Sequence, residues 1–120
     1  TLQHHGFQFQ TESDTEVILK AYAHWGVESF EFFNGMFAIA LWDDRKKQLV
    51  LARDHAGIKP LYYYLEEGVL YFASEIRAFA HSGKIFEEHP HWKAAFLSFG
   101  HLPEPITTLH KVIPLPKGSA

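Results

Sequence analysis

Cysteine is absent from this sequence of 120 residues, which excludes disulfide bonds, cysteine-based metal sites and a thiol nucleophile within it. No apolar run approaches the roughly 20 residues of a membrane-spanning helix, and no signal peptide opens the sequence. A formal net charge of −3 supplies no basic surface for nucleic acid. These absences favour a cytoplasmic protein that binds neither nucleic acid nor a membrane.

The residues that are present favour one small folded domain. Hydrophobic residues make up 47% of the sequence and aromatic residues 16%, which is enough to predict an ordered core. The nine histidines lack the spacing that places two metal ligands on one helix face, so we expect no metal site. Phosphate-binding glycine motifs are also absent, so we expect no ATP site in this segment.

The beginning of the sequence predicts two helices. Ser13 and Glu16 have the spacing of a capping box, in which the Ser13 hydroxyl accepts from the Glu16 amide and the Glu16 carboxylate reaches back. Apolar residues then recur at helical spacing until Gly26, which ends the helix. A shorter helix is expected over residues 28–33.

The middle of the sequence predicts four strands, over residues 36–43, 48–53, 61–65 and 69–73, in one antiparallel sheet. The first strand carries apolar residues at both alternating sets of positions, so both of its faces are expected to be buried. Ser74 is predicted to cap a helix over 75–81, and a last helix over 91–99 should end at Gly100. The fold class is therefore α+β.

Residues 101–120 contain four prolines. They are expected to form an extended linker or docking segment after a domain over 1–100.

The segment from residue 51 to residue 64 predicts a specified corner between two strands. Arg53 and Asp54 end the first strand, and a glycine and a proline follow before the next. A salt bridge between Arg53 and Asp54 is the preferred reading, with anion binding as the alternative. Glu75 is expected to pair with Arg53 or with Lys59. These four residues are predicted to shape the edge of the sheet and a contact with another domain.

Several motifs together resemble a known family. They are RDHAGIKPLYY at residues 53–63, YFASEI at 71–76, SDTEVI at 13–18, NGMFAIALWD at 34–43, SFGHLPEP at 98–105 and LPKG at 115–118. In this order they resemble the glutaminase domain of asparagine synthetases and their class II glutamine amidotransferase relatives. The resemblance implies an N-terminal nucleophile hydrolase fold, an αββα sandwich of antiparallel sheets. This chain would be its C-terminal part, with much of one sheet and the helices that cover it.

The resemblance also implies roles for two residues. Asp14 matches the aspartate that binds the α-amino group of glutamine, and a carboxylate opposite an ammonium group fits that chemistry. From its position alone, the preferred reading of Asp14 is a first-turn acid that favours the helix dipole, and only the resemblance reverses this preference. Met36 is either a core residue that fills a gap or part of the route by which ammonia leaves. We expect no catalytic residue in this chain, because the family's cysteine nucleophile and oxyanion residues precede the Asp14 motif.

The chain is therefore expected to be a piece of a longer polypeptide, with on the order of a hundred residues before it, close to the size of one domain. The whole protein would hydrolyse glutamine and pass ammonia to a C-terminal synthetase domain. That domain would use ATP and Mg²⁺ to amidate aspartate, and the protein could assemble as a homodimer. Two alternatives stay open: a relative with another acceptor, and a non-catalytic glutaminase-like scaffold.

Overall fold

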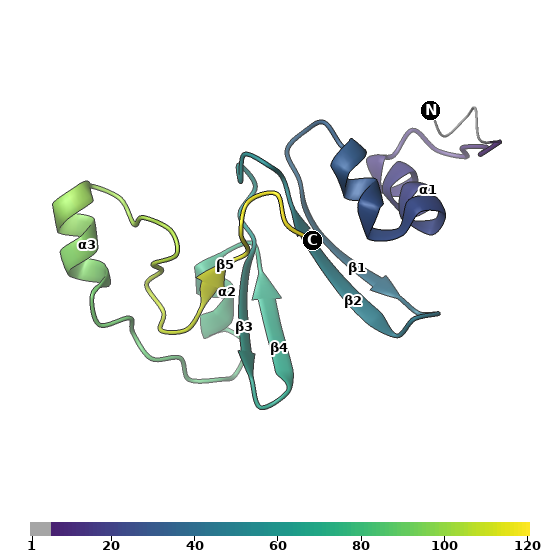
Figure 1. The fold of residues 1–120 in the computed structure, drawn as a ribbon. Coiled ribbons are helices and arrows are strands. Elements are labelled where there is room, and N and C mark those ends of the chain that lie inside the picture. The colour runs from purple at the N-terminus through teal and green to yellow at the C-terminus, as the bar shows by residue number, and fades with distance from the viewer. Residues whose placement is uncertain (1–5) are drawn as a thin grey trace.

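The computed structural model describes residues 6–120 (Figure 1). In chain order its elements are α1 (Asp14–Trp25), the 3-10 helix η2 (Gly26–Phe32), β1 (Ala38–Asp43), β2 (Gln48–Arg53), β3 (Tyr62–Glu66), β4 (Val69–Ala73), α2 (Ile76–Ala80), α3 (Trp92–Phe99) and β5 (Ile113–Pro114). Every pair of strands is antiparallel. The mixture of helices and antiparallel strands confirms the α+β class.

Helix α1 begins and ends where the sequence predicted. Ser13 has an extended backbone and its hydroxyl accepts from the Thr15 amide at 3.2 Å, while Gly26 at φ 65° ends the helix. The predicted capping box is wrong in both halves. The Ser13 hydroxyl accepts from Thr15 rather than from Glu16, whose amide donates to the Ser13 carbonyl at 3.1 Å. The Glu16 carboxylate turns to the amides of Gln10 and Thr11 instead, because the preceding chain folds back along the helix.

The strands form two sheets rather than the single one predicted. β1 and β2 make a two-stranded hairpin, and the second sheet has the order β4-β3-β5. The chain leaves the first sheet at residue 53 and enters the second at residue 62. The corner between them turns the backbone away, so β2 and β3 are neighbours in sequence without pairing.

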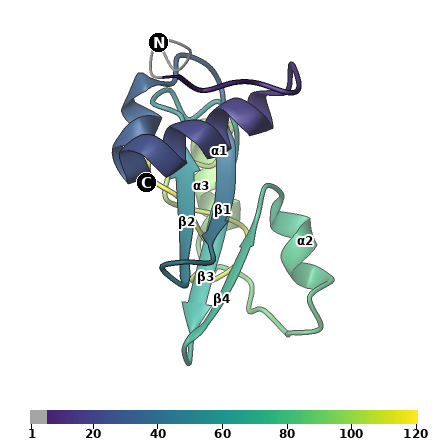
Figure 2. The ribbon, with the colours of Figure 1, turned by 90° about the vertical axis from the view of Figure 1, so that its right-hand side faces the viewer.

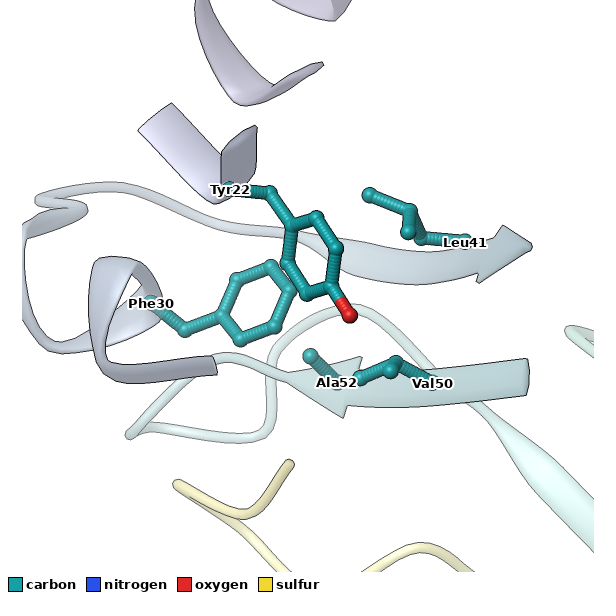
Figure 3. Close-up of a cluster of buried hydrophobic side chains, with 5 residues drawn as sticks. All are labelled: Tyr22, Phe30, Leu41, Val50 and Ala52. Carbon is teal, nitrogen blue, oxygen red and sulfur yellow. The ribbon is translucent and has the colours of Figure 1, made fainter. Parts of the chain in front are cut away.

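Each sheet has its own apolar core. In the first, Tyr22 and Phe30 point from the helices toward Leu41, Val50 and Ala52 on the hairpin (Figure 3). The Tyr22 hydroxyl continues past this cluster to Asp43, whose carboxylate it approaches at 3.3 Å. α1 and η2 are therefore fixed on one face of the β1–β2 hairpin.

The second core lies between the β4-β3-β5 sheet and α2. Its buried members are Tyr64, Phe79 and Val112, and the Phe86 ring packs against Tyr64 with the ring centroids 5.0 Å apart. Val112 belongs to the proline-containing tail, so residues beyond 100 complete this core. In Figure 1, α1 lies on the outer side of β1 and β2, and α2 lies on the side of β3 that faces away from them.

The faces turned away from these helices are uncovered. Trp42 on β1 is 57% exposed, so the prediction that both faces of this strand are buried was wrong for the described residues. On the second sheet, Leu65 is 64% and Phe72 41% exposed. The radius of gyration is 17.0 Å, whereas a compact domain of this length has about 13.6 Å. The chain is therefore less compact than a typical domain of its length.

The last twenty residues return to the sheets rather than extending away from them. β5 pairs with Tyr62 and Tyr63 of β3, and the Leu115 amide donates to the Leu61 carbonyl at 2.7 Å. Helix α3 ends at Gly100 in the left-handed conformation, as predicted. The cap predicted at Ser74 is wrong, because Glu75 holds the N-cap position of α2 and no side chain caps it.

Candidate functional site

Arg53 forms the centre of the corner between the two sheets. Its side chain is 5% exposed, and the guanidinium donates to the carbonyl oxygens of Gly57 at 2.7 Å, Leu115 at 2.8 Å and Lys59 at 3.0 Å. A fourth bond goes to Glu104 Oε1 at 3.1 Å. One side chain thus ties the end of β2 to its own loop and to the returning tail.

Asp54 organises the loop itself. Its side chain is buried and accepts from the amides of Ile58 and Lys59, each at 3.0 Å. Its carbonyl accepts from the amides of Gly57 and Gly118 at 2.9 and 3.1 Å. Hydrogen bonds to the carboxylate, led by that from the Lys59 amide, lower the pKa of Asp54. The charged carboxylate therefore holds the turn closed.

These contacts contradict the predicted ion pairs. Arg53 and Asp54 do not pair with each other: Arg53 binds three carbonyls and Glu104, and the Asp54 carboxylate binds backbone amides. Glu75 pairs with Arg77 at 2.7 Å in an exposed position, not with Arg53 or Lys59. Lys59 contributes its backbone amide and carbonyl to the corner.

The acid that Arg53 contacts, Glu104, was missed. It lies 51 positions away in sequence, and no local pattern connects such residues.

A second set of predicted residues comes together beside α1. A shallow cavity of about 370 Å³ separates the start of the helix from the loop that leads into β1. Its lining residues are Asp14, Val17, Ile18, Phe32, Phe33, Asn34, Gly35, Met36 and Phe37. Asp14 and Met36, the two residues for which the resemblance implied a part in handling glutamine and ammonia, therefore border one space. Met36 is 58% exposed and does not fill a gap in the core.

The position of Asp14 follows from the helix that carries it. Asp14 and Ile18 are four residues apart and so share a face. Ile18 packs on the apolar cluster of the first sheet. Asp14 therefore lies on the side of the helix that faces this sheet. The Asp14 carboxylate is exposed and accepts no hydrogen bond from residues 6–120. The positive end of the helix dipole supports its charge.

Residues 6–120 contain neither a metal-binding cluster nor a membrane-spanning helix. Within residues 6–120, no group of three histidine, cysteine or acidic side chains is arranged to hold a metal ion. In the same range, no helix is both long and apolar enough to cross a membrane.

Comparison with known proteins identifies the family. A family model described as a glutamine amidotransferase domain matches residues 1–120, and the chain belongs to this family. It is 47% identical over 85 residues to asparagine synthetase B [glutamine-hydrolyzing] of Escherichia coli, a match that covers 70% of this chain and 15% of that protein. The resemblance to the asparagine synthetases seen in the sequence is thereby confirmed.

Two more relatives show the range of the similarity. Asparagine synthetase [glutamine-hydrolyzing] 1 of Bacillus subtilis is 39% identical over 106 residues, covering 88% of this chain and 17% of that protein. Amidase chry2 of Gibberella zeae is 38% identical over 86 residues, covering 72% of this chain and 12% of that protein. The chain thus spans less than a fifth of the length of these curated relatives.

Proposed function

We propose that this chain is part of the glutamine-hydrolysing domain of an asparagine synthetase-like enzyme, and that Asp14 binds the α-ammonium group of glutamine. The observation that carries the proposal is the free carboxylate of Asp14 at the border of the cavity shared with Met36. The family match supports glutamine as the substrate.

The contrast between the two acids of the first helical turn supports this role for Asp14. The Glu16 carboxylate is occupied by Gln10, Thr11 and Lys20, so it serves the fold. Asp14 has no such partner among residues 6–120, and a rigid helix start holds it. An ammonium group placed there would gain a charge-assisted hydrogen bond, and the apolar Val17 and Ile18 beside it suit the methylene groups of glutamine.

The rest of the reaction is assigned to sequence outside these 120 residues. We propose that a cysteine nucleophile supplied there attacks the glutamine carboxamide and expels ammonia, and that water then hydrolyses the resulting thioester to release glutamate. A C-terminal synthetase domain would then use ATP and Mg²⁺ to amidate aspartate. The boundary between a domain over 1–100 and a segment over 101–120, the homodimer and the cytoplasmic location stay predictions.

The fold proposed for the complete domain is the αββα sandwich. The arrangement of two antiparallel sheets supports it, because each carries helices on one side and an exposed apolar face on the other. In this sandwich the chain would contribute strands to both sheets, whereas the sequence predicted that it supplies much of one sheet.

Met36 is proposed to line the route by which ammonia leaves. Its exposed side chain at the border of the same cavity supports this role. In the full-length protein, Met36→Lys should raise the amount of glutamate released per asparagine formed. An unchanged ratio would contradict the role.

The substrate role of Asp14 is tested by glutaminase kinetics of the full-length protein. Asp14→Asn removes the charge and keeps the shape, and a hydrogen bond to a charged group contributes about 1.5–3 kcal/mol. The KM for glutamine should therefore rise about 10- to 150-fold. Glu12→Gln, the same loss of charge two residues earlier, is the matched control and should leave KM unchanged. Equal KM values for wild type and Asp14→Asn would refute the substrate role.

The similarity to a protein named as an amidase favours one alternative, a relative with another acceptor. Glutaminase activity without asparagine formation from aspartate would support that alternative. Absence of glutaminase activity in the full-length protein would support the scaffold.

A further inference from the structure

The chain that precedes α1 folds back and runs along the helix. Figure 2 shows this segment crossing beside α1 and turning at the start of the helix. Phe7 packs against His24 with ring centroids 5.4 Å apart, and Lys20 Nζ lies 4.6 Å from the centre of the Phe9 ring. We call residues 7–11 the strap.

The strap and the helix match in spacing. Alternate strap residues (7, 9 and 11) contact helix residues four apart (24, 20 and 16). An extended chain advances about 6.6 Å over two residues, and a helix advances about 6.0 Å over four. Three successive contacts can therefore stay in register along the helix, which explains why a segment without a sheet partner follows α1.

Glu16 makes the strongest of these contacts. Its carboxylate accepts from the Gln10 amide at 3.0 Å, the Thr11 amide at 2.7 Å and the Thr11 hydroxyl at 2.6 Å. Lys20 completes the cluster by donating to the Glu16 carboxylate and to the Gln8 carbonyl. These hydrogen bonds lower the pKa of Glu16 to about 2. The largest contribution comes from Lys20, followed by the Thr11 hydroxyl and the Gln10 amide. The carboxylate thus remains charged at neutral pH.

The contact continues from Glu16 to the residue before Asp14. The Thr11 hydroxyl, which donates to Glu16, also accepts from the Ser13 amide at 3.3 Å. The Ser13 hydroxyl in turn accepts from the Thr15 amide at 3.2 Å. Asp14 therefore stands between two residues whose amides are both fixed by hydrogen bonds.

We propose that Glu16 is a positioning residue of the glutamine site: through Thr11 it fixes the Ser13 turn and so holds the Asp14 carboxylate toward the substrate. The inference rests on the proposed role of Asp14 and adds a cause for its orientation. Glu16 touches neither substrate nor reacting atoms in this scheme.

The test uses the full-length protein with Glu16→Gln, which keeps the size of the side chain and removes its charge. The KM for glutamine should rise about five- to tenfold, comparable to the loss of one hydrogen bond's contribution, with kcat within about twofold. The Gln10 and Thr11 amides should exchange hydrogen faster in the same variant. The rate of asparagine formation with free ammonium in place of glutamine should not change, because ammonium bypasses the glutamine site.

Thr11 supplies a milder pair of variants should Glu16→Gln fail to fold. Thr11→Val removes the hydroxyl at nearly constant volume and should raise KM, while Thr11→Ser restores the hydroxyl and should return KM to the wild-type value. Glu12→Gln is again the control. Faster amide exchange with an unchanged KM, in Glu16→Gln or Thr11→Val, would overturn the proposal and leave the role of Asp14 intact. An unchanged KM in Asp14→Asn would instead remove the proposed function itself.

Discussion

Replacing Arg53 by methionine should release residues 115–119 from the corner while the strands remain. The variant keeps most of the aliphatic stem of the side chain and removes every guanidinium donor. The carbonyl oxygens of Gly57, Lys59 and Leu115 then lose the donor that reaches them at 2.7–3.0 Å. The Glu104 carboxylate is 44% exposed and can be solvated by water instead. Loss of its bond to Arg53 therefore costs less than loss of the bonds to the carbonyls.

The size of the effect follows from these three carbonyls. A buried acceptor left without a partner costs about 1–3 kcal/mol. The three hydrogen bonds are only partly buried, which places each carbonyl at the lower end of that range, so three of them give about 3 kcal/mol. An opening equilibrium shifted by this amount changes on the order of 100-fold. The expected loss of stability is a substantial fraction of the total free energy of unfolding of a typical domain, which is about 5–15 kcal/mol.

Native-state hydrogen exchange measures this opening directly. The amides to follow are those of Leu115, bonded to Leu61, and Gly118, bonded to Asp54. Their protection should fall on the order of 100-fold in Arg53→Met. Arg77→Met is the matched control, since that arginine is 83% exposed and its surface ion pair contributes little. Equal protection in the two variants would refute the reasoning.

Two further predictions concern the corner and the uncovered sheet. The pKa of Asp54 lies below its ordinary value of 3.8, so its contribution to stability is fully present above that pH and is lost as the pH falls through the lowered value. Exchange protection of the Ile58 and Lys59 amides should accordingly be constant from about pH 7 to 5 and decline below about pH 4, a dependence that Asp54→Asn should abolish. The isolated 120-residue chain should self-associate through its exposed apolar face, and lysine at both Leu65 and Phe72 should reduce light scattering; equal scattering would place the association elsewhere.

Elements with strong local signals were predictable from the sequence. β2 at Gln48–Arg53 and β4 at Val69–Ala73 have the predicted bounds, because short continuous apolar runs end at charged or glycine-containing turns. Helix α1 is defined by a serine cap and a terminating glycine at the two ends of an apolar stripe. The roles of Asp14 and Met36 were indicated only through the resemblance, and the cavity that they share was not predicted, since nothing in local periodicity connects residues 14 and 36.

Long-range contacts could not be predicted in the same way. Arg53 meets the Leu115 carbonyl across 62 positions, and backbone carbonyls carry no sequence signal. β5 has two residues, one of them Pro114, so its propensity argued against a strand. The division into two sheets depends on the direction of the corner, which is set by these same distant hydrogen bonds.

The partners of Arg53 have a consequence for how this protein tolerates sequence change. Three of its four acceptors are main-chain carbonyls, which every amino acid supplies. Lys59 and Leu115 can therefore be substituted by other residues without loss of the carbonyl acceptor. No other side chain offers the five donors of arginine. Sequence constraint at the corner therefore falls on Arg53 and on the buried carboxylate of Asp54, and much less on the residues that supply the carbonyls.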